Sequence, residues 1–176
     1  HPQGAATRRP GTQFISEVKT SSLKTRLIPF EFSTTQTYML EFGNQYIRFF
    51  KDKGQILEGD KTISAITKAN PGVVTASSHG YSDGDFVVIS SVAGMTQVNG
   101  KTFKVADKTT NTFELQDVDG NDINSSGYST YSSGGVANRI YQITTSYTTA
   151  QLFDLKFSQS ADVLYITHPS HEVSKL

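Results

Sequence analysis

The chain has 176 residues, enough for one large domain or two small ones with a buried core. It has no cysteine, which excludes disulfides, thiolate metal sites and cysteine nucleophiles, and its 16 basic side chains balance 16 acidic ones. No region is basic enough to indicate a polyanion partner, and the longest apolar run, Phe86 to Ile89, falls far short of the roughly 20 residues of a membrane span, so we expect a soluble polypeptide.

The first residues read "HPQGAATRRPGTQF", beginning on His1 instead of Met and becoming strand-like soon afterwards. We therefore hypothesise that an N-terminal portion of the parent protein is missing. Arg8 and Arg9 are adjacent cations that can neutralise phosphates if the protein lines a DNA channel. They equally fit the start of an exposed strand, or a contact with a carboxylate of a neighbouring subunit. We keep both as candidate interface residues.

Alternation of apolar and polar residues with period two dominates the chain and predicts strands with one buried face. In "TRLIPFEFS", Ile28, Phe30 and Phe32 share one face, while Glu31 points the other way. Pro29 predicts an edge position, where no ladder donor is required.

The next segment, from Thr37 to Lys51, alternates in the same way on both sides of Asn44. Asn44 lies next to Gly43, and both residue types favour turns. This segment is therefore predicted to be a β-hairpin.

From Ile63 to Ile140 the chain becomes a series of short strands, spaced as in a small barrel or sandwich. Only "FVVI" is apolar throughout, which predicts a strand covered on both faces. The residue pairs predicted to form turns between the strands are Pro71-Gly72, Asp83-Gly84, Asn99-Gly100, Asp119-Gly120 and Gly134-Gly135.

After Tyr141 an alternating strand returns, and then the pattern changes. Leu152, Leu155 and Phe157 have the spacing of a short helix of at most about three turns, capped by Thr148 or Thr149. A last strand, "DVLYITH", leads to Pro169.

The predicted fold class is mainly β, with one short helix near the C-terminus. Residues 1–63 and 140–176 are expected to form a discontinuous outer β domain. Residues 64–139 are expected to form a small antiparallel β-barrel inserted into it. Insertion at an exposed hairpin tip is tolerated because the two ends of the insert lie close together.

Three residues of the insert, His79, Ser82 and Asp83, are of the types found in a hydrolytic triad. A triad needs its members to converge through hydrogen bonds, which neighbours in one tight turn rarely do, and no G-x-S-x-G nucleophile elbow is present. We therefore interpret Asp83-Gly84 as a turn that His79 helps to order, and we predict no catalytic residue.

Two further groups invite a metal. The loop "DVDGND", residues 117–122, is acidic but lacks the closing glutamate of an EF-hand and spans half its length, so a β-turn at Asp119-Gly120 explains it better. His168 and His171 have an H-x-x-H spacing, but Pro169 between them disfavours a helix and no third ligand is evident. No metal and no cofactor is predicted.

The segment "NSSGYSTYSSGG" places Tyr128 and Tyr131 among small polar residues. Aromatic anchors among adaptable small residues are typical of a recognition loop, although a long hairpin end has the same composition. Both tyrosines are kept as candidate recognition residues.

A set of residues in the insert carries a family resemblance when taken together. Its members are Pro71, Val74, His79-Gly80, Asp83 to Asp85, Val87, Gly94-Met95, Asn99-Gly100, Phe103, Val105, Phe113, Leu115, Gly120 and "YSSGG" at Tyr131 to Gly135. In this combination the insert resembles the first catalytic cysteine half-domain of ubiquitin-activating enzymes, in the form found widely within bacteriophage proteins. Ubiquitin activation itself is not expected, because the chain has neither a cysteine for a thioester nor a nucleotide-binding glycine loop.

The flanks contain "RRPGT", "LIPFEFS" and "QSADVLYITHP". With these motifs they resemble the N-terminal region of phage tail proteins that build the nozzle or tail tip, although the chain stops at Leu176, where such proteins usually continue. The resemblance implies a virion structural component in the phage tail, assembled as a homo-oligomeric ring with other tail proteins.

The expected function is therefore non-enzymatic: the outer domain provides subunit contacts and the barrel projects from it. The alternative is a host-attachment module that binds a bacterial surface glycan or protein through the barrel loops. Nucleic acid is a partner only if the protein lines a tail channel. An enzymatic function, such as cell-wall cleavage, has no supporting group of residues.

Overall fold

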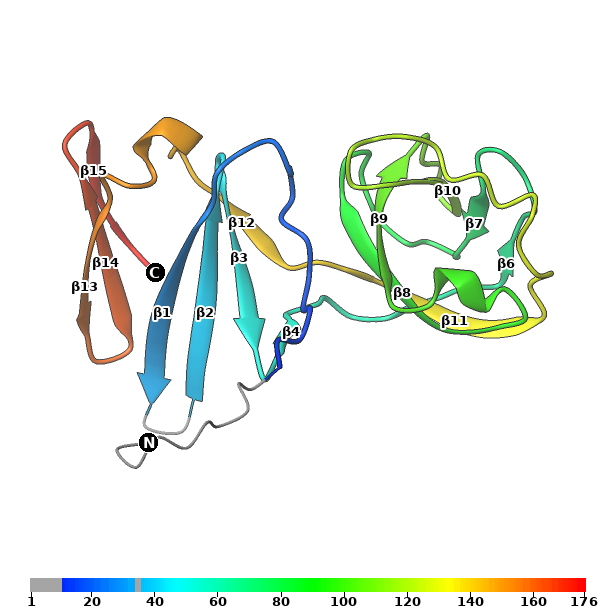
Figure 1. Cartoon of the computed structure of the whole chain (residues 1–176), viewed down its shortest axis with the longest axis horizontal. Coiled ribbons are helices and arrows are strands. Elements are labelled where there is room, and N and C mark those ends of the chain that lie inside the picture. Colours follow the sequence, from blue (N-terminus) through cyan, green and yellow to red (C-terminus); the bar gives the residue numbers. More distant parts are fainter. Residues whose placement is uncertain (1–10, 34–35) are drawn as a thin grey trace, which may run out of the picture.

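The computed structural model describes residues 11–33 and 36–176, without the side chain of Phe32. Arg8 and Arg9 lie outside the described residues. Within them the chain folds into antiparallel sheets with two single-turn 3-10 helices, as Figure 1 shows. The predicted mainly β fold class is confirmed.

One sheet has five strands in the order β1-β2-β3-β12, with β4 paired to β3. Its strands are β1 (Arg26–Ser33), β2 (Gln36–Gly43), β3 (Tyr46–Lys51), β4 (Gly54–Gln55) and β12 (Gln142–Thr144). Strands β2 and β3 form the predicted hairpin, which closes at the Gly43–Tyr46 pair. The turn residue Gln45 has a φ of 64°, a value that tight hairpin turns require.

Strand β1 lies at the edge of this sheet, as Pro29 predicts. The backbone N–H of Glu31 donates to Gln159 Oε1 at 3.3 Å, and the Glu31 carbonyl accepts from Gln159 Nε2. The backbone of Glu31 therefore faces away from β2. Because alternate residues of a strand direct their backbone groups to the same side, Pro29 also faces the free edge and removes a donor from it.

The second sheet has seven strands in the order β5-β11-β8-β9-β10-β7-β6, and it curls into a half-barrel (Figure 1). Its strands are β5 (Lys61–Thr62), β6 (Ala65–Ile66), β7 (Val73–Thr75), β8 (Phe86–Ala93), β9 (Lys101–Ala106), β10 (Thr112–Gln116) and β11 (Ser133–Arg139). A 3-10 turn, η1 (Thr96–Val98), joins β8 to β9. Every pair of neighbouring strands is antiparallel.

The apolar run at the start of β8 is covered on both faces, as predicted. Val87 and Ile89 are fully buried in the core of the curled sheet. Phe86, on the opposite face, is 5% exposed and lies against the guanidinium of Arg48 in β3, 4.8 Å from ring centre to Cζ.

The predicted turns are confirmed at Asp83-Gly84, Asn99-Gly100 and Asp119-Gly120, whose glycines have φ between 72° and 93°. The prediction of a turn at Gly134-Gly135 is wrong. Both glycines lie inside β11, with Gly134 paired to Val92 of β8. Their positive φ values fit a close approach to β8, because a Cβ on Gly135 would lie 2.4 Å from Val92 Cγ2.

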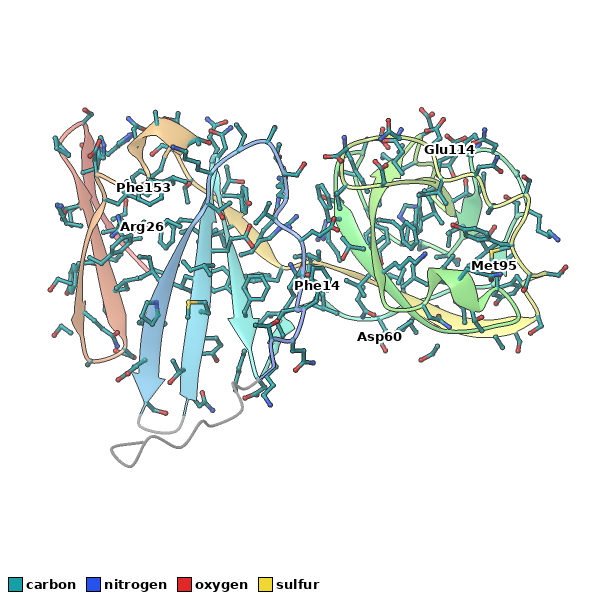
Figure 2. All side chains as sticks on the ribbon, viewed as in Figure 1. Phe14, Arg26, Asp60, Met95, Glu114 and Phe153 are labelled. Atoms are coloured by element: carbon teal, nitrogen blue, oxygen red, sulfur yellow. The ribbon has the colours of Figure 1, made fainter. Side chains whose placement is uncertain are left out.

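The third sheet has three strands, β13 (Lys156–Ser160), β14 (Val163–His168) and β15 (His171–Lys175). It is preceded by η2 (Thr149–Gln151), a single 3-10 turn that replaces the longer helix predicted here. The side chain of Arg26 in β1, labelled in Figure 2, explains the difference: its Nη1 donates to the carbonyls of Leu152 and Leu155, both at 2.9 Å, which a continuing helix would use itself. Thr148 lies at the N-cap position of this turn, as predicted, and its N–H donates to Gln151 Oε1 at 3.0 Å.

Two separate hydrophobic clusters stabilise these sheets. The first fills the curled sheet, from Ile63 to Ala137. The second lies between the five-stranded and three-stranded sheets, with Phe42 and Phe157 packed edge to face at 5.1 Å. We call these two parts the barrel and the sandwich. The predicted domain boundaries, 64–139 and the remainder, stay a prediction.

The barrel and the sandwich are joined by two chain segments that pair with each other. Leu57 and Ile140 form an antiparallel bridge, and the N–H of Tyr141 donates to the carbonyl of Ile56 at 2.9 Å. Arg139 Nη2 donates to Glu58 Oε2 at 2.6 Å across the same pairing. We call residues 56–58 with 139–141 the ribbon.

Candidate interaction surface

Apolar side chains are exposed on the outer face of the five-stranded sheet, away from the sandwich core. Alternation along β2 directs Leu40 and Phe42 into the core and leaves Met39 on the other face, where it is 38% exposed. Leu27 of β1 is on this outer face and is 59% exposed. Two exposed apolar side chains on neighbouring strands make this face a candidate interaction surface.

These residues form the floor of a groove of about 460 Å³. Leu27, Met39 and Phe50 line it from the sheet, and Ile15 and Val18 line it from the segment that precedes β1. Lys51 and Lys53, at the end of β3, also line it. The sheet and the preceding segment thus line the groove mainly with apolar side chains, as in the centre of protein interfaces.

The inner end of the groove meets a buried polar cluster. Glu41 is 3% exposed and accepts a hydrogen bond from the Tyr46 hydroxyl at 2.5 Å. Burial, with the Glu41 carboxylate beside it, raises the pKa of Tyr46 well above its ordinary value. Arg48 lies opposite Glu41 in the β2–β3 ladder, is 1% exposed, and has its pKa lowered mainly by burial. These groups fix the floor of the groove rather than react.

The two candidate recognition tyrosines lie in the barrel and pack partly buried against its core. The hydroxyl of Tyr131 donates to the carbonyls of Ile63 and Gly134, at 3.0 and 2.9 Å. The backbone N–H of Tyr128 donates to the carbonyl of Ser125. Both residues therefore order the loop that precedes β11, and a role in recognition stays a prediction.

The residues of the suspected triad do not converge. His79 is 2% exposed; its Nδ1 accepts from the N–H of Tyr81 at 3.0 Å, and its Nε2 lies 3.3 Å from the Thr112 carbonyl. Asp83 Oδ1 instead accepts from the N–H of Lys108. The N–H of Ser82 donates to Asp85. These bonds order the turn, as the sequence predicts.

The acidic loop is likewise a turn. Asp117 Oδ1 accepts from the N–H groups of Asp119 and Asn121, at 3.0 and 2.8 Å. Because the Asn121 side chain also donates to Asp117, the pKa of this carboxyl is lowered. Over residues 11–33 and 36–176 no three His, Asp or Glu side chains are grouped so as to hold a metal ion.

His168 and His171 pair across the turn between β14 and β15, with ring centres 5.0 Å apart. Both nitrogens of His171 are engaged, Nδ1 with Ser146 at 3.2 Å and Nε2 with Gln151 at 3.1 Å. They are strand residues, as Pro169 predicts. In the described part of the chain, no helix is long and apolar enough to cross a membrane.

Sequence reasoning missed the groove. Leu27 and Met39 are single apolar residues at outward positions, which period two alone assigns to water. The sequence does contain two apolar residues at outward positions of neighbouring strands. Their proximity can be predicted only from the register of β1 against β2, which places Leu27 opposite Glu41 and Pro29 opposite Met39.

The barrel defines the class of this part of the chain: a small antiparallel module built around one curled sheet. Residues 69–140 match the family model of the ubiquitin-activating enzyme E1 FCCH domain. This part of the chain is therefore an E1 FCCH domain, and the resemblance expected from the sequence is confirmed for the barrel.

Ubiquitin-activating enzymes are among the whole proteins that are similar to this chain. Ubiquitin-like modifier-activating enzyme 1 of the rabbit, Oryctolagus cuniculus, is 37% identical over 104 residues, which cover 57% of this chain and 9% of the enzyme. The human enzyme is 33% identical over the same length. The chain thus spans about a tenth of the length of these relatives.

Proposed function

We propose that this chain is a non-enzymatic structural module of a phage tail, in which the sandwich contacts neighbouring copies and the barrel projects. The observation that carries the proposal is the apolar groove over Leu27 and Met39, a surface that a second protein would cover. The phage context rests on the resemblance of the flanks to tail proteins.

The face of the five-stranded sheet supports subunit contact better than its β1 edge does. Pro29 removes a donor from that edge and Gln159 occupies the backbone of Glu31. Few backbone groups are left for a strand of another copy. A groove, in contrast, accepts apolar side chains without needing a ladder.

The test is the molar mass of the protein in solution, measured by size-exclusion chromatography with light scattering over a range of concentrations. We expect assemblies for the wild-type chain and monomers for Leu27→Glu with Met39→Glu, because a charge in the groove must lose its water on assembly. Val173→Glu is the matched control, since Val173 is 62% exposed on the other sheet. A wild-type chain that stays monomeric at high concentration overturns the subunit contact.

Gold labelling of the barrel on whole virions tests the phage assignment separately. Labels on the tail are expected. Particles without label, from a phage that encodes the chain, contradict it.

A second candidate function is attachment to a bacterial surface glycan or protein through the barrel loops. It is favoured by the position of the loop that leads into β11, residues 123–132, which lies on the side of the barrel away from the sandwich (Figure 1). Binding of the labelled chain to host cells tests it. Loss of binding in Tyr128→Ala, with groove variants unaffected, would assign attachment to these loops.

A further inference from the structure

Three separate parts of the chain meet between the barrel and the sandwich. Arg48 and Tyr46 come from β3 of the sandwich, and Phe86 comes from β8 of the barrel. All three are at most 5% exposed. The third part is the segment before β1, which runs between the sandwich and the barrel in Figure 1.

Lys19 of this segment contacts both sides. Its Nζ lies 5.2 Å from the ring centre of Tyr46 and 5.9 Å from that of Phe86. Burial first, and then the nearby Arg48 cation, lowers the pKa of Lys19, which agrees with a side chain enclosed by its neighbours.

Ser21 makes a second contact with the barrel, two residues further along. Its hydroxyl donates to Asp119 Oδ1 at 2.9 Å, across 98 positions of sequence. Asp119 is in the turn that Asp117 holds through two backbone N–H groups. The contact therefore ends on an ordered part of the barrel.

The same segment contacts the sandwich on both sides of Lys19 and Ser21 in the sequence. Val18 and Thr25 line the groove on the outer face of the sheet, and β1 begins at Arg26. Residues 18–21 therefore contact both parts of the molecule, at Phe86 next to the ribbon and at Asp119 in the barrel turn.

We propose that residues 18–21 form a strap that holds the barrel in one orientation relative to the sandwich. The ribbon is a second, covalent connection, and a two-stranded connection on its own can bend and twist. Parts of a chain move relative to one another by default unless a sufficient interface prevents it. The strap supplies a further point of attachment, in addition to the ribbon and the contact between Arg48 and Phe86.

The experiment measures the distribution of distances between two spin labels in the full chain. Because the chain has no cysteine, Glu172→Cys in β15 and Lys101→Cys in β9 provide unique label sites on exposed side chains. In this background, Lys19→Ala with Ser21→Ala removes the strap contacts. We expect a distance distribution about twofold broader than that of the labelled wild-type chain.

The matched control is Ser22→Ala with Lys24→Ala, which changes the same two residue types at exposed positions of the same segment. Its distribution should equal that of the wild-type chain. An unchanged width in the strap variant overturns the proposal, because the ribbon and the Arg48–Phe86 contact would then suffice. Equal broadening in both double variants also overturns it, since the effect would belong to the segment in general.

Discussion

The barrel and the sandwich solve the problem of burying apolar side chains in different ways. The barrel curls one sheet around its own core, so that Val74, Phe113 and Leu115 are fully buried without another layer. The sandwich covers only one face of its five-stranded sheet with a second sheet. Its outer face keeps Leu27 and Met39 in contact with water.

This difference teaches where to look for partners. A sheet that curls around its own core has one inner face, and its outer residues can be polar. An open sheet has two faces, and apolar residues on the uncovered one cost free energy until another surface meets them. By this criterion the core of the barrel needs no further layer, whereas the five-stranded sheet of the sandwich has one face with apolar side chains still exposed.

The largest effect is expected from emptying one core while leaving the other intact. Phe113→Ala should cost about 3–5 kcal/mol, because it leaves a cavity among fully buried residues of the barrel. Since the two clusters share no residue, hydrogen exchange should accelerate at Leu115 and stay slow at Leu40. Phe42→Ala should give the reverse pattern. Equal acceleration in both cores would contradict their independence.

A smaller effect is expected at the turn that closes β8. Gly94 has a φ of 82°, and a Cβ there would lie 2.1 Å from the Thr130 carbonyl oxygen. Gly94→Ala should therefore cost about 2–4 kcal/mol, from backbone strain and displacement of the neighbouring loop. Gly100→Ala is the control, because its φ is 72° but its Cβ meets nothing within 4 Å. Urea unfolding should show a clearly smaller decrease in the free energy of unfolding for the control, about 1 kcal/mol. Equal decreases would show that the contact with Thr130 adds nothing to the cost.

The smallest effect depends on pH and concerns a barrel phenol. The Tyr81 hydroxyl donates to the Ala137 carbonyl at 2.8 Å, and burial raises its pKa from 10.0 to about 12. Tyr81→Phe should cost about 1 kcal/mol at neutral pH. Above pH 10 the unfolded chain releases this proton while the folded chain keeps it, so wild-type stability falls with rising pH.

Tyr81→Phe has no phenol to titrate at this position, and a rise in pKa from 10.0 to about 12 corresponds to about 3 kcal/mol, more than the hydrogen bond contributes. The stability difference between the two proteins should therefore shrink to zero and change sign between pH 10 and about pH 12. Urea titrations at a series of pH values measure it. A constant difference over this range would show that the phenol titrates alike in the folded and unfolded chains.

Local patterns predicted the elements well. Alternation located the strands, the Asn44 turn was correct, and Pro29 identified an edge strand before any pairing was known. These features depend on neighbours within a few residues. The turn predicted at Gly134-Gly135 is wrong because a glycine pair fits a tight turn and a close approach of two strands equally well.

Long-range contacts could not be predicted in this way. Leu152 and Leu155 have a helical spacing and are both buried, but Arg26, more than 120 residues earlier, takes their carbonyls. Alternation assigns Arg48 to an exposed face, whereas Lys19 and Phe86 enclose it. The groove and the strap could not be predicted for the same reason, since each is formed by segments that are distant in the sequence.

The ribbon has a consequence for how such chains diversify. Because Leu57 and Ile140 are bridged, everything between them leaves and returns at a single point, beside Glu58 and Arg139. A short reverse turn in place of the barrel would keep this exit and return point, but it would uncover Arg48, which Phe86 now covers. The barrel is therefore one insertion by its connections and part of the sandwich surface by its contacts.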